Sequence, residues 1–132
     1  MPEFGQNQKL ARHRLVQAIN AERDRRVSAG FVFQGHRFDF DQDSAANITG
    51  AGASAGIAMA LGAEQGNLRW ADPEKDFSFL SQDNVWLPMD AHTCFAFSQA
   101  ALRHKHAHIR AARSIKDTVP VPQDFTNDVF WP

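Results

Sequence analysis

The segment Gly30–Gly50 combines a tight aromatic hairpin with the beginning of a helix made of small residues. Its turn is Gln34-Gly35, where glycine at the second position supplies the positive φ that a primed two-residue turn needs. This turn pairs Phe31 with Phe38, and the alternation of side chains puts Phe31, Phe33 and Phe38 on one face. A lone hairpin is marginal in water, whereas burying one Phe stabilises a fold by roughly 1.5–3 kcal/mol. We therefore expect the rings to dock on a helix.

The same rings could instead form an exposed platform for nucleic acid. Only His36 and Arg37 are basic nearby, and the net charge of the chain is −1, whereas nucleic-acid surfaces are strongly basic. We interpret the rings as core residues and expect no nucleic-acid partner. The most apolar run, Ala51–Ala63, is too short and too rich in glycine to span a bilayer, so no membrane partner is expected.

Two longer helical patterns flank this segment. Residues 9–29 carry apolar side chains at helical spacing, and Gly30 stands where a C′ glycine would end the helix. Residues 91–117 form the second pattern, with Asp90 as the candidate N-cap. Its predicted core-facing stripe is marked by residues seven apart and widened by their neighbours: Phe95, Leu102 and Ile109, then Cys94, Phe97, Ala101 and Ile115.

Residues 44–61 form a third predicted helix, which is rich in glycine and alanine. Gly52 and Gly56 are four residues apart, so one face of this helix has little side-chain bulk. Each glycine costs roughly 0.5–1 kcal/mol relative to alanine in a helix interior, and close approach of another helix would compensate for that cost. The neighbour is either another helix of this chain or a second copy, and the sequence leaves both open.

Acidic residues precede this helix at alternate positions: Asp39, Asp41 and Asp43. Their spacing is similar to that of a calcium loop, but Phe40 interrupts the oxygen-rich run and no closing glutamate follows. Carboxylates also suit the positive end of a helix. We interpret these residues, together with Ser44, as candidate N-caps.

A second hairpin is predicted by Phe77–Leu80 and Val85–Leu87, which bracket a four-residue loop. Asn67–Trp70 is compatible with a further short strand. The predicted fold class is therefore α+β, with three helices packed against two short antiparallel β-hairpins and an extended C-terminal arm.

A single domain is expected over residues 9–117. Met1–Gln8 is interpreted as a disordered N-terminus or as residues left by cloning. Residues 118–132 are rich in proline and end in Phe130-Trp131, which favours an extended arm. The aromatic end of the arm would either pack on its own domain or grip a neighbouring subunit.

His104, His106 and His108 form the strongest chemical-looking feature. His104 and His108 are four residues apart on one helix face, a spacing that can chelate a metal. A zinc site needs a third protein ligand, and the glutamate of an HExxH motif is missing. We interpret the three as solvated or partly buried histidines, keep adventitious metal binding as the alternative, and predict no resident metal or cofactor.

Two patterns in the sequence could indicate a nucleophile. The only cysteine, Cys94, lies early in a predicted helix, where the dipole lowers a thiol pKa, but it shares the apolar stripe with Phe97, which favours a buried structural thiol. The run Gly52–Gly56 matches GxSxG literally, yet it lies within a helix instead of a strand-to-helix elbow. No residue is assigned a catalytic role and no enzyme is expected. A metal-dependent hydrolase is the least favoured alternative.

Motifs in a fixed order along the chain carry a resemblance: Asn20–Asp24, Gly30-Phe31, Gly35–Asp39, Asn47–Gly50, Leu68–Trp70, Asp76-Phe77, Asp83-Asn84, Pro88–Ala91 and Phe97. Over residues 19–117 the chain resembles a small domain of unknown function found in tail proteins of tailed phages and prophages. That family is associated with tail fibres or their assembly. It has no established catalytic residues to carry over, and Phe40 stands where a small polar residue is expected.

The resemblance implies a non-enzymatic structural or attachment module that makes protein–protein contacts in the tail or fibre region. Its partners would be other tail or fibre proteins and copies of itself, as a homo-oligomer for which a trimer is one option. It would be located in the virion tail, or in the host cytoplasm during assembly. A tail-fibre assembly chaperone is the alternative. The candidate interaction residues are Phe31, Phe33, Phe38, Gly52, Gly56, Trp70, Trp86, Phe130 and Trp131.

Overall fold

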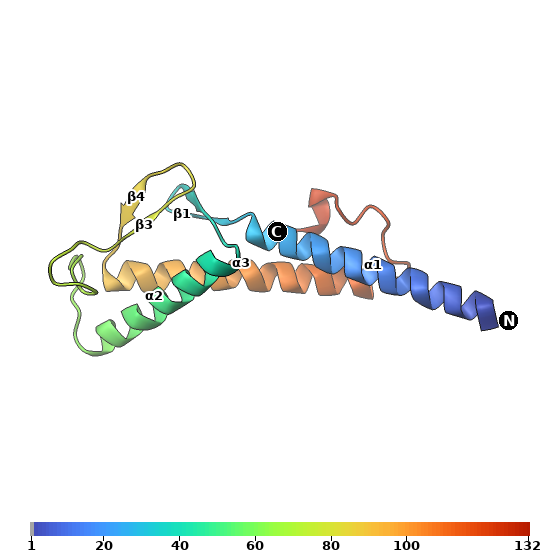
Figure 1. The fold of residues 1–132 in the computed structure, drawn as a ribbon, viewed down its shortest axis with the longest axis horizontal. Helices are drawn as coiled ribbons and strands as arrows, with labels where there is room; N and C mark the ends of the chain where they lie inside the picture. Colours follow the sequence, from blue (N-terminus) through green and yellow to red (C-terminus); the bar gives the residue numbers. More distant parts are fainter. Residues whose placement is uncertain (1) are drawn as a thin grey trace. The chain divides into compact units, whose positions relative to one another are not determined.

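The computed structural model describes the backbone of residues 2–132 and the side chains from Gly5 onward. Three helices and two antiparallel two-stranded sheets follow along the chain (Figure 1), so the predicted α+β class is confirmed. The chain forms two compact units where the sequence predicts one domain with an arm. The central unit is Ser28–His104, and the terminal unit joins the residues up to Val27 with Lys105–Pro132.

Helix α1 spans Pro2–Ser28 and therefore begins before Lys9, the expected first residue. Proline is tolerated at the first position of a helix because its missing N–H would have no partner there. Residues 2–8, which were expected to be disordered or left by cloning, thus belong to the same helix, and Met1 lies outside the described residues. At the other end Gly30 has a φ of 107°, the left-handed conformation expected of a glycine that follows a helix.

Helix α3 spans Ala91–Asp117, the bounds that the sequence predicts. Asp90 caps it, because its Oδ1 accepts a hydrogen bond from the Thr93 N–H at 2.7 Å. The predicted stripe is centred wrongly, by a rotation about the helix axis: the residues seven apart, Phe95, Leu102 and Ile109, are exposed. The residues predicted to widen the stripe, Cys94, Phe97, Ala101 and Ile115, are buried as expected, and Ala91, His108 and Ala112 complete the buried face.

Phe97 is the centre of the core of the central unit, which explains that rotation. Strands β1 (Phe31–Phe33) and β2 (His36–Phe38) pair in the predicted register, and the turn residues between them have positive φ. The ring centroids of Phe31, Phe33 and Phe38 lie 5.3, 5.2 and 4.8 Å from that of Phe97. Docking three rings on one side chain fixes which face of α3 is buried.

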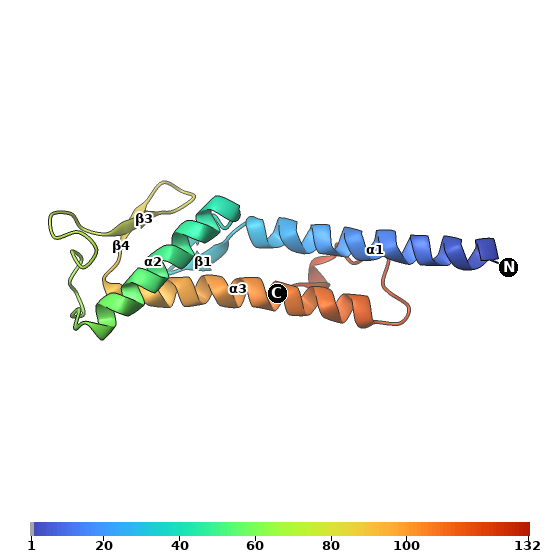
Figure 2. The same cartoon turned by 60° about the horizontal axis from the view of Figure 1, so that its bottom comes forward.

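Helix α2, Gln42–Ala60, crosses the first half of α3 (Figure 2). A Cβ built on Gly52 would overlap the side chain of Ser98, and one on Gly56 would lie 3.7 Å from the ring of Phe95. Both neighbours belong to α3. The glycine face of α2 is therefore filled from within the chain, in the first of the two arrangements that the sequence leaves open.

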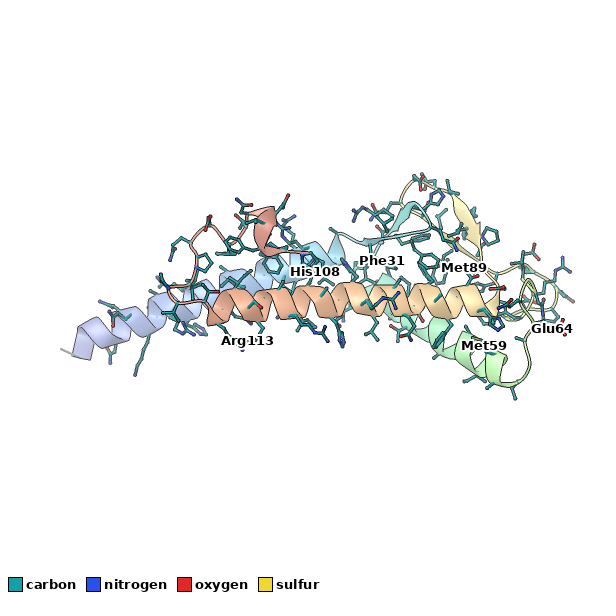
Figure 3. All side chains as sticks on the ribbon, turned by 180° about the vertical axis from the view of Figure 1, so that it is seen from behind. Phe31, Met59, Glu64, Met89, His108 and Arg113 are labelled. Carbon is teal, nitrogen blue, oxygen red and sulfur yellow. The ribbon has the colours of Figure 1, made fainter. Side chains whose placement is uncertain are left out.

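The second hairpin consists of β3 (Ser78–Leu80) and β4 (Trp86–Pro88). Phe31 and Met89 lie between the hairpins and α3 (Figure 3), and both are buried. The strand considered for Asn67–Trp70 does not form, because Asn67 Oδ1 accepts from the Arg69 N–H and makes a local turn. The Trp70 indole N–H donates to Met89 O at 3.0 Å, which anchors this loop.

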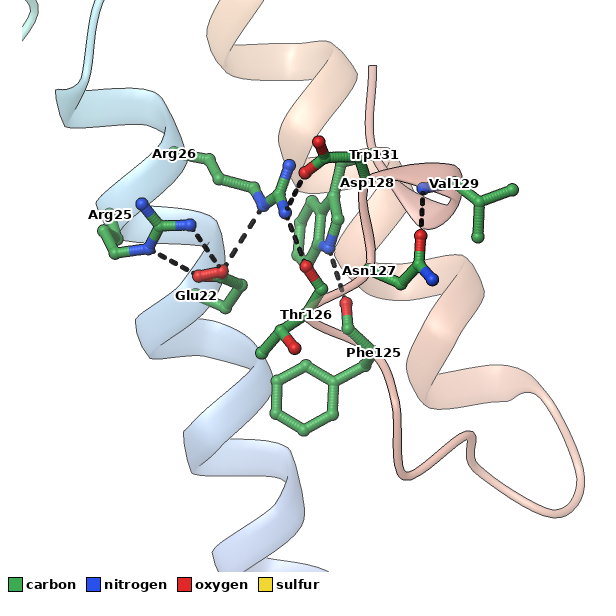
Figure 4. Close-up of polar contacts among 9 residues, drawn as sticks. All are labelled: Glu22, Arg25, Arg26, Phe125, Thr126, Asn127, Asp128, Val129 and Trp131. Carbon is green, nitrogen blue, oxygen red and sulfur yellow. Dashed lines mark hydrogen bonds and ion pairs between the residues drawn. The ribbon is translucent and has the colours of Figure 1, made fainter.

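The terminal unit has its own core, built from α1, α3 and the C-terminal arm: Ile19, Ala112, Ile115, Phe125 and Trp131. Arg26 fastens the arm by donating to Thr126 O and to an oxygen of Asp128, at 2.7 and 2.8 Å (Figure 4). Its guanidinium carbon lies 5.3 Å from the ring centroid of Trp131. The arm, which includes the short 3-10 helix η1 (Asp128–Phe130), packs on its own chain.

Candidate protein interface

The nine candidate interaction residues fall into two groups. Most of them pack within their own unit: Phe31, Phe38, Gly52 and Trp131 are buried, and Phe33, Gly56, Trp70 and Phe130 are half-buried. Trp86, in contrast, leaves 62% of its surface exposed. Among the nine candidates, Trp86 is therefore the residue with the largest exposed fraction available for contact with another molecule.

The geometry of β3 and β4 turns Trp86 outward. Leu80 lies opposite it in the register and is 43% exposed. Side chains alternate along a strand, and the ring of Phe79 points inward, with its centroid 4.9 Å from that of Phe97. Leu80 and Trp86 therefore share the face that points away from the core. Val85, which precedes β4, is exposed as well.

A groove of about 250 Å³ adjoins this pair. Its lining comes from the two hairpins and the first turns of α2: Phe38, Asp39, Ser44, Asn47, Ile48, Ser78, Phe79, Leu80 and Trp86. Phe38 and Ile48 are almost fully buried and give the groove an apolar base. Sites for small organic ligands usually measure roughly 300–1,000 Å³, so this groove has room for one large side chain.

The charge in the groove is negative. Asp39 is exposed, and among the described residues that line the groove none is Lys, Arg or His. Asp41, the N-cap residue of α2, lies two residues further on, and a hydrogen bond from the Ser44 side chain lowers its pKa. Asp41 therefore stays ionised at neutral pH and adds a second negative charge two residues from Asp39.

A Ser–Asp–His grouping between the loop after β3 and the first residue of β2 was not anticipated from the sequence. Ser81 Oγ donates to Asp83 Oδ1, and His36 Nδ1 lies 3.4 Å from Asp83 Oδ2. The hydrogen bond from Ser81, with a smaller contribution from His36, lowers the pKa of Asp83. A nucleophilic triad needs the histidine between the serine and the acid. Here both residues meet the same carboxylate, so the grouping fastens the loop.

Comparison with known proteins gives the family. A family model described as "Domain of unknown function (DUF4376)" matches residues 10–129, which is most of the chain. The chain belongs to the DUF4376 family. No curated protein and no solved structure shows a significant match. The resemblance to a domain of unknown function is therefore confirmed.

Two of the three clustered histidines of this DUF4376 domain, His104 and His108, are engaged in ring contacts, and His106 is exposed. The His104 ring lies 5.9 Å from those of Phe31 and Phe40, and the His108 ring stacks on Trp131 at 6.2 Å. Within the part of the chain that the structure describes, no three His, Cys, Asp or Glu side chains could together hold a metal ion. Cys94 is fully buried, and burial raises the pKa of its thiol to about 11. The thiol is therefore protonated at neutral pH.

Sequence reasoning about the DUF4376 domain named Trp86 but missed the groove beside it. The outward position of Leu80 could have been predicted from the sequence. Side chains alternate along a strand, so an inward Phe79 puts the next residue, which is aliphatic, on the outer face. Asp39 and Asn47 come from other elements, and only packing brings them to the same groove.

None of the described helices is long and apolar enough to cross a bilayer.

Proposed function

We propose that this domain is a non-enzymatic structural or attachment module of a phage tail, which contacts other tail or fibre proteins through the surface around Trp86. The exposure of Trp86 opposite Leu80 is the observation that carries the proposal. Tryptophan is among the residues most enriched at the energetic centres of protein interfaces. The resemblance of the motifs to tail proteins supports the phage setting.

The exposed indole is large enough to anchor a contact. An aromatic side chain buries roughly 150–250 Å², so covering the exposed 62% of Trp86 removes on the order of 120 Å² from water. At about 25 cal/mol per Å² this stabilises a complex by roughly 3 kcal/mol. A contribution of that size is typical of a hot-spot residue.

A second exposed surface supports self-association as a homo-oligomer, with a trimer as one option. Residues 44–63, which include most of α2, contain no charged side chain. Ile57 and Leu61 are 64% and 83% exposed, on the side of α2 left free when Gly52 packs on Ser98. An exposed, uncharged helix face suits contact with a copy of itself.

The protein composition of purified phage particles tests the proposed role of this chain in the tail. Mass spectrometry of purified particles from a phage that encodes this chain should find the chain with the tail proteins. Trp86→Ala should then reduce its copy number at least about tenfold, the effect of losing roughly 1.4 kcal/mol or more of contact energy. Val129→Ala, an exposed aliphatic position on the terminal unit, serves as the control.

A tail-fibre assembly chaperone would give a different result. It would be found bound to tail or fibre proteins in infected cells and would be missing from the finished particle. A wild-type chain that is absent from both the particles and such complexes contradicts both roles.

A further inference from the structure

We propose that the groove beside Trp86 receives an extended segment of a partner protein in which an arginine stands next to a large aliphatic residue. The inference rests on the proposed function, because it names the chemistry of the partner that such a module would hold. Three features of one groove support it: the shape, the charge and the aromatic wall. All three come from the same nine lining residues.

The apolar part of the groove selects an aliphatic anchor. Phe38 and Ile48 form a base with almost no access to solvent, and Leu80 and Trp86 extend it outward. A space of about 250 Å³ takes a single Leu, Ile or Met side chain and is small for a cofactor. The occupant is therefore part of a larger chain that inserts one residue.

The polar part of the groove selects a cation beside that anchor. Asp39 offers an exposed carboxylate, and Ser44, Asn47 and Ser78 offer neutral hydrogen-bonding groups. The nearest arginine in the sequence, Arg37, already donates from its Nη1 to Gly30 O at 3.1 Å. An acidic segment or a phosphate backbone would meet the negative potential of Asp39 and its neighbours and be repelled.

Arginine fits better than lysine because of Trp86. A planar guanidinium can stack on an indole and can also pair with a carboxylate through two parallel hydrogen bonds. Asp39 and Trp86 line the same groove, so one arginine side chain has both kinds of partner within a single site. A lysine ammonium is a compact, strongly hydrated charge and gains less from the aromatic wall.

Selection from a library of random heptapeptides displayed on filamentous phage tests this specificity without knowledge of the natural partner. The full chain is immobilised, and the selected peptides should be enriched in arginine adjacent to Leu, Ile or Met. The charge-reversed variant Asp39→Lys should lose that enrichment and favour Asp or Glu at the same position. Peptides without arginine enrichment, or the same peptides selected by both proteins, would overturn the inference.

Titration with one defined peptide measures how much individual groove residues contribute to the binding affinity. Amide chemical shifts of the full chain are followed during titration with acetyl-Gly-Leu-Arg-Gly-amide, with Glu in place of Arg as the matched peptide. The amides of residues 78–80 and of Asn47 should shift saturably with the arginine peptide only. Asp39→Asn should weaken binding by about threefold to fivefold, as expected for an exposed ion pair, and Trp86→Ala by about thirtyfold.

The control variant is Asp124→Asn, which removes an exposed carboxylate from the terminal unit and should leave the affinity unchanged. Equal affinity for the two peptides, or unchanged affinity in Asp39→Asn, refutes the assigned chemistry. Shifts at the groove that depend on protein concentration without any peptide refute it too, because a second copy would then be the occupant.

Different results would refute the proposed tail role and the proposed arginine specificity of the groove. If particles lose the Trp86→Ala chain but keep Asp39→Lys at the wild-type copy number, the tail role stands and the arginine specificity is refuted. If the wild-type chain is absent from particles, the tail role is refuted, while the peptide selection still decides the specificity of the groove.

Discussion

Replacing Trp131 by alanine should destabilise the terminal unit strongly, because this side chain joins the C-terminal arm to α1 and α3. Trp131 is 7% exposed and belongs to the core cluster with Ile19 and Ile115. Its indole N–H donates to Phe125 O at 2.7 Å. The substitution therefore removes a buried ring and one hydrogen bond, together with the ring surface that Arg26 covers.

Substitutions of buried Trp by Ala typically cost about 3–5 kcal/mol. With a urea m-value of about 2 kcal/mol per M for a small protein, the midpoint of unfolding should fall by about 2 M. Trp131→Phe keeps most of the ring and loses the indole donor, so its cost should be closer to about 1–2 kcal/mol, since it also leaves a buried carbonyl without its partner.

Urea unfolding followed by far-ultraviolet circular dichroism measures these effects, because α1 and α3 supply much of the helical signal. The matched control is Trp86→Ala, which removes the same side chain from an exposed site and should change the free energy of unfolding by less than about 1 kcal/mol. If the two alanine variants unfold at the same urea concentration, then Trp131 does not hold the arm and the reasoning is refuted.

Three further predictions follow from the central unit. Hydrogen bonds from the backbone N–H groups of Gly66 and Thr93 lower the pKa of Asp90 below its unfolded value, so its contribution to stability is complete above the unfolded pKa and is lost as the pH falls through the folded pKa. Acid unfolding should show this loss below about pH 4, and Asp90→Asn should remove that part of the pH dependence. Gly52→Ala should destabilise by about 1–3 kcal/mol, because its Cβ would overlap Ser98, whereas Gly50→Ala, where a Cβ meets nothing within 4 Å, should be neutral or stabilising by up to about 1 kcal/mol in thermal unfolding. Ile57→Asp should keep the far-ultraviolet circular dichroism spectrum of the wild type and reduce the mass measured by light scattering to that of a monomer; an unchanged oligomer would exclude the outer face of α2 as the contact.

Features that depend on residues close together in the sequence, such as a turn or a helix cap, were predicted correctly. The pairing of Phe31 with Phe38 follows from a two-residue turn ending in Gly35, and the start of α3 follows from the capping carboxylate of Asp90. In each case a short-range steric or hydrogen-bonding rule allows few alternatives. The same rules located the second hairpin to within one residue.

The orientation of α3 could not be predicted in this way. A stripe through Phe95 and Leu102 and a stripe through Cys94 and Phe97 are both compatible with the helical period, since the sets lie side by side on the helix. Contact of Phe97 with the hairpin rings decides between them. Trp86 was a candidate from the sequence, but its exposure depends on the packing of Phe79 against Phe97 on the inner face of the hairpin.

The sequence by itself determined the order of the helices and hairpins, the bounds of α3, which residues pair across the first turn, and that the chain is an α+β protein, whereas α1 begins earlier than predicted and α2 spans residues 42–60 and not 44–61. These properties depend on backbone conformation and on contacts over a few residues. Tertiary structure alone decided which face of α3 is buried, that Gly52 meets Ser98 and not a second copy, and that Asp39 shares a groove with Trp86. Such choices depend on which distant side chains fill the same space, and many arrangements satisfy the local rules equally well until packing selects one.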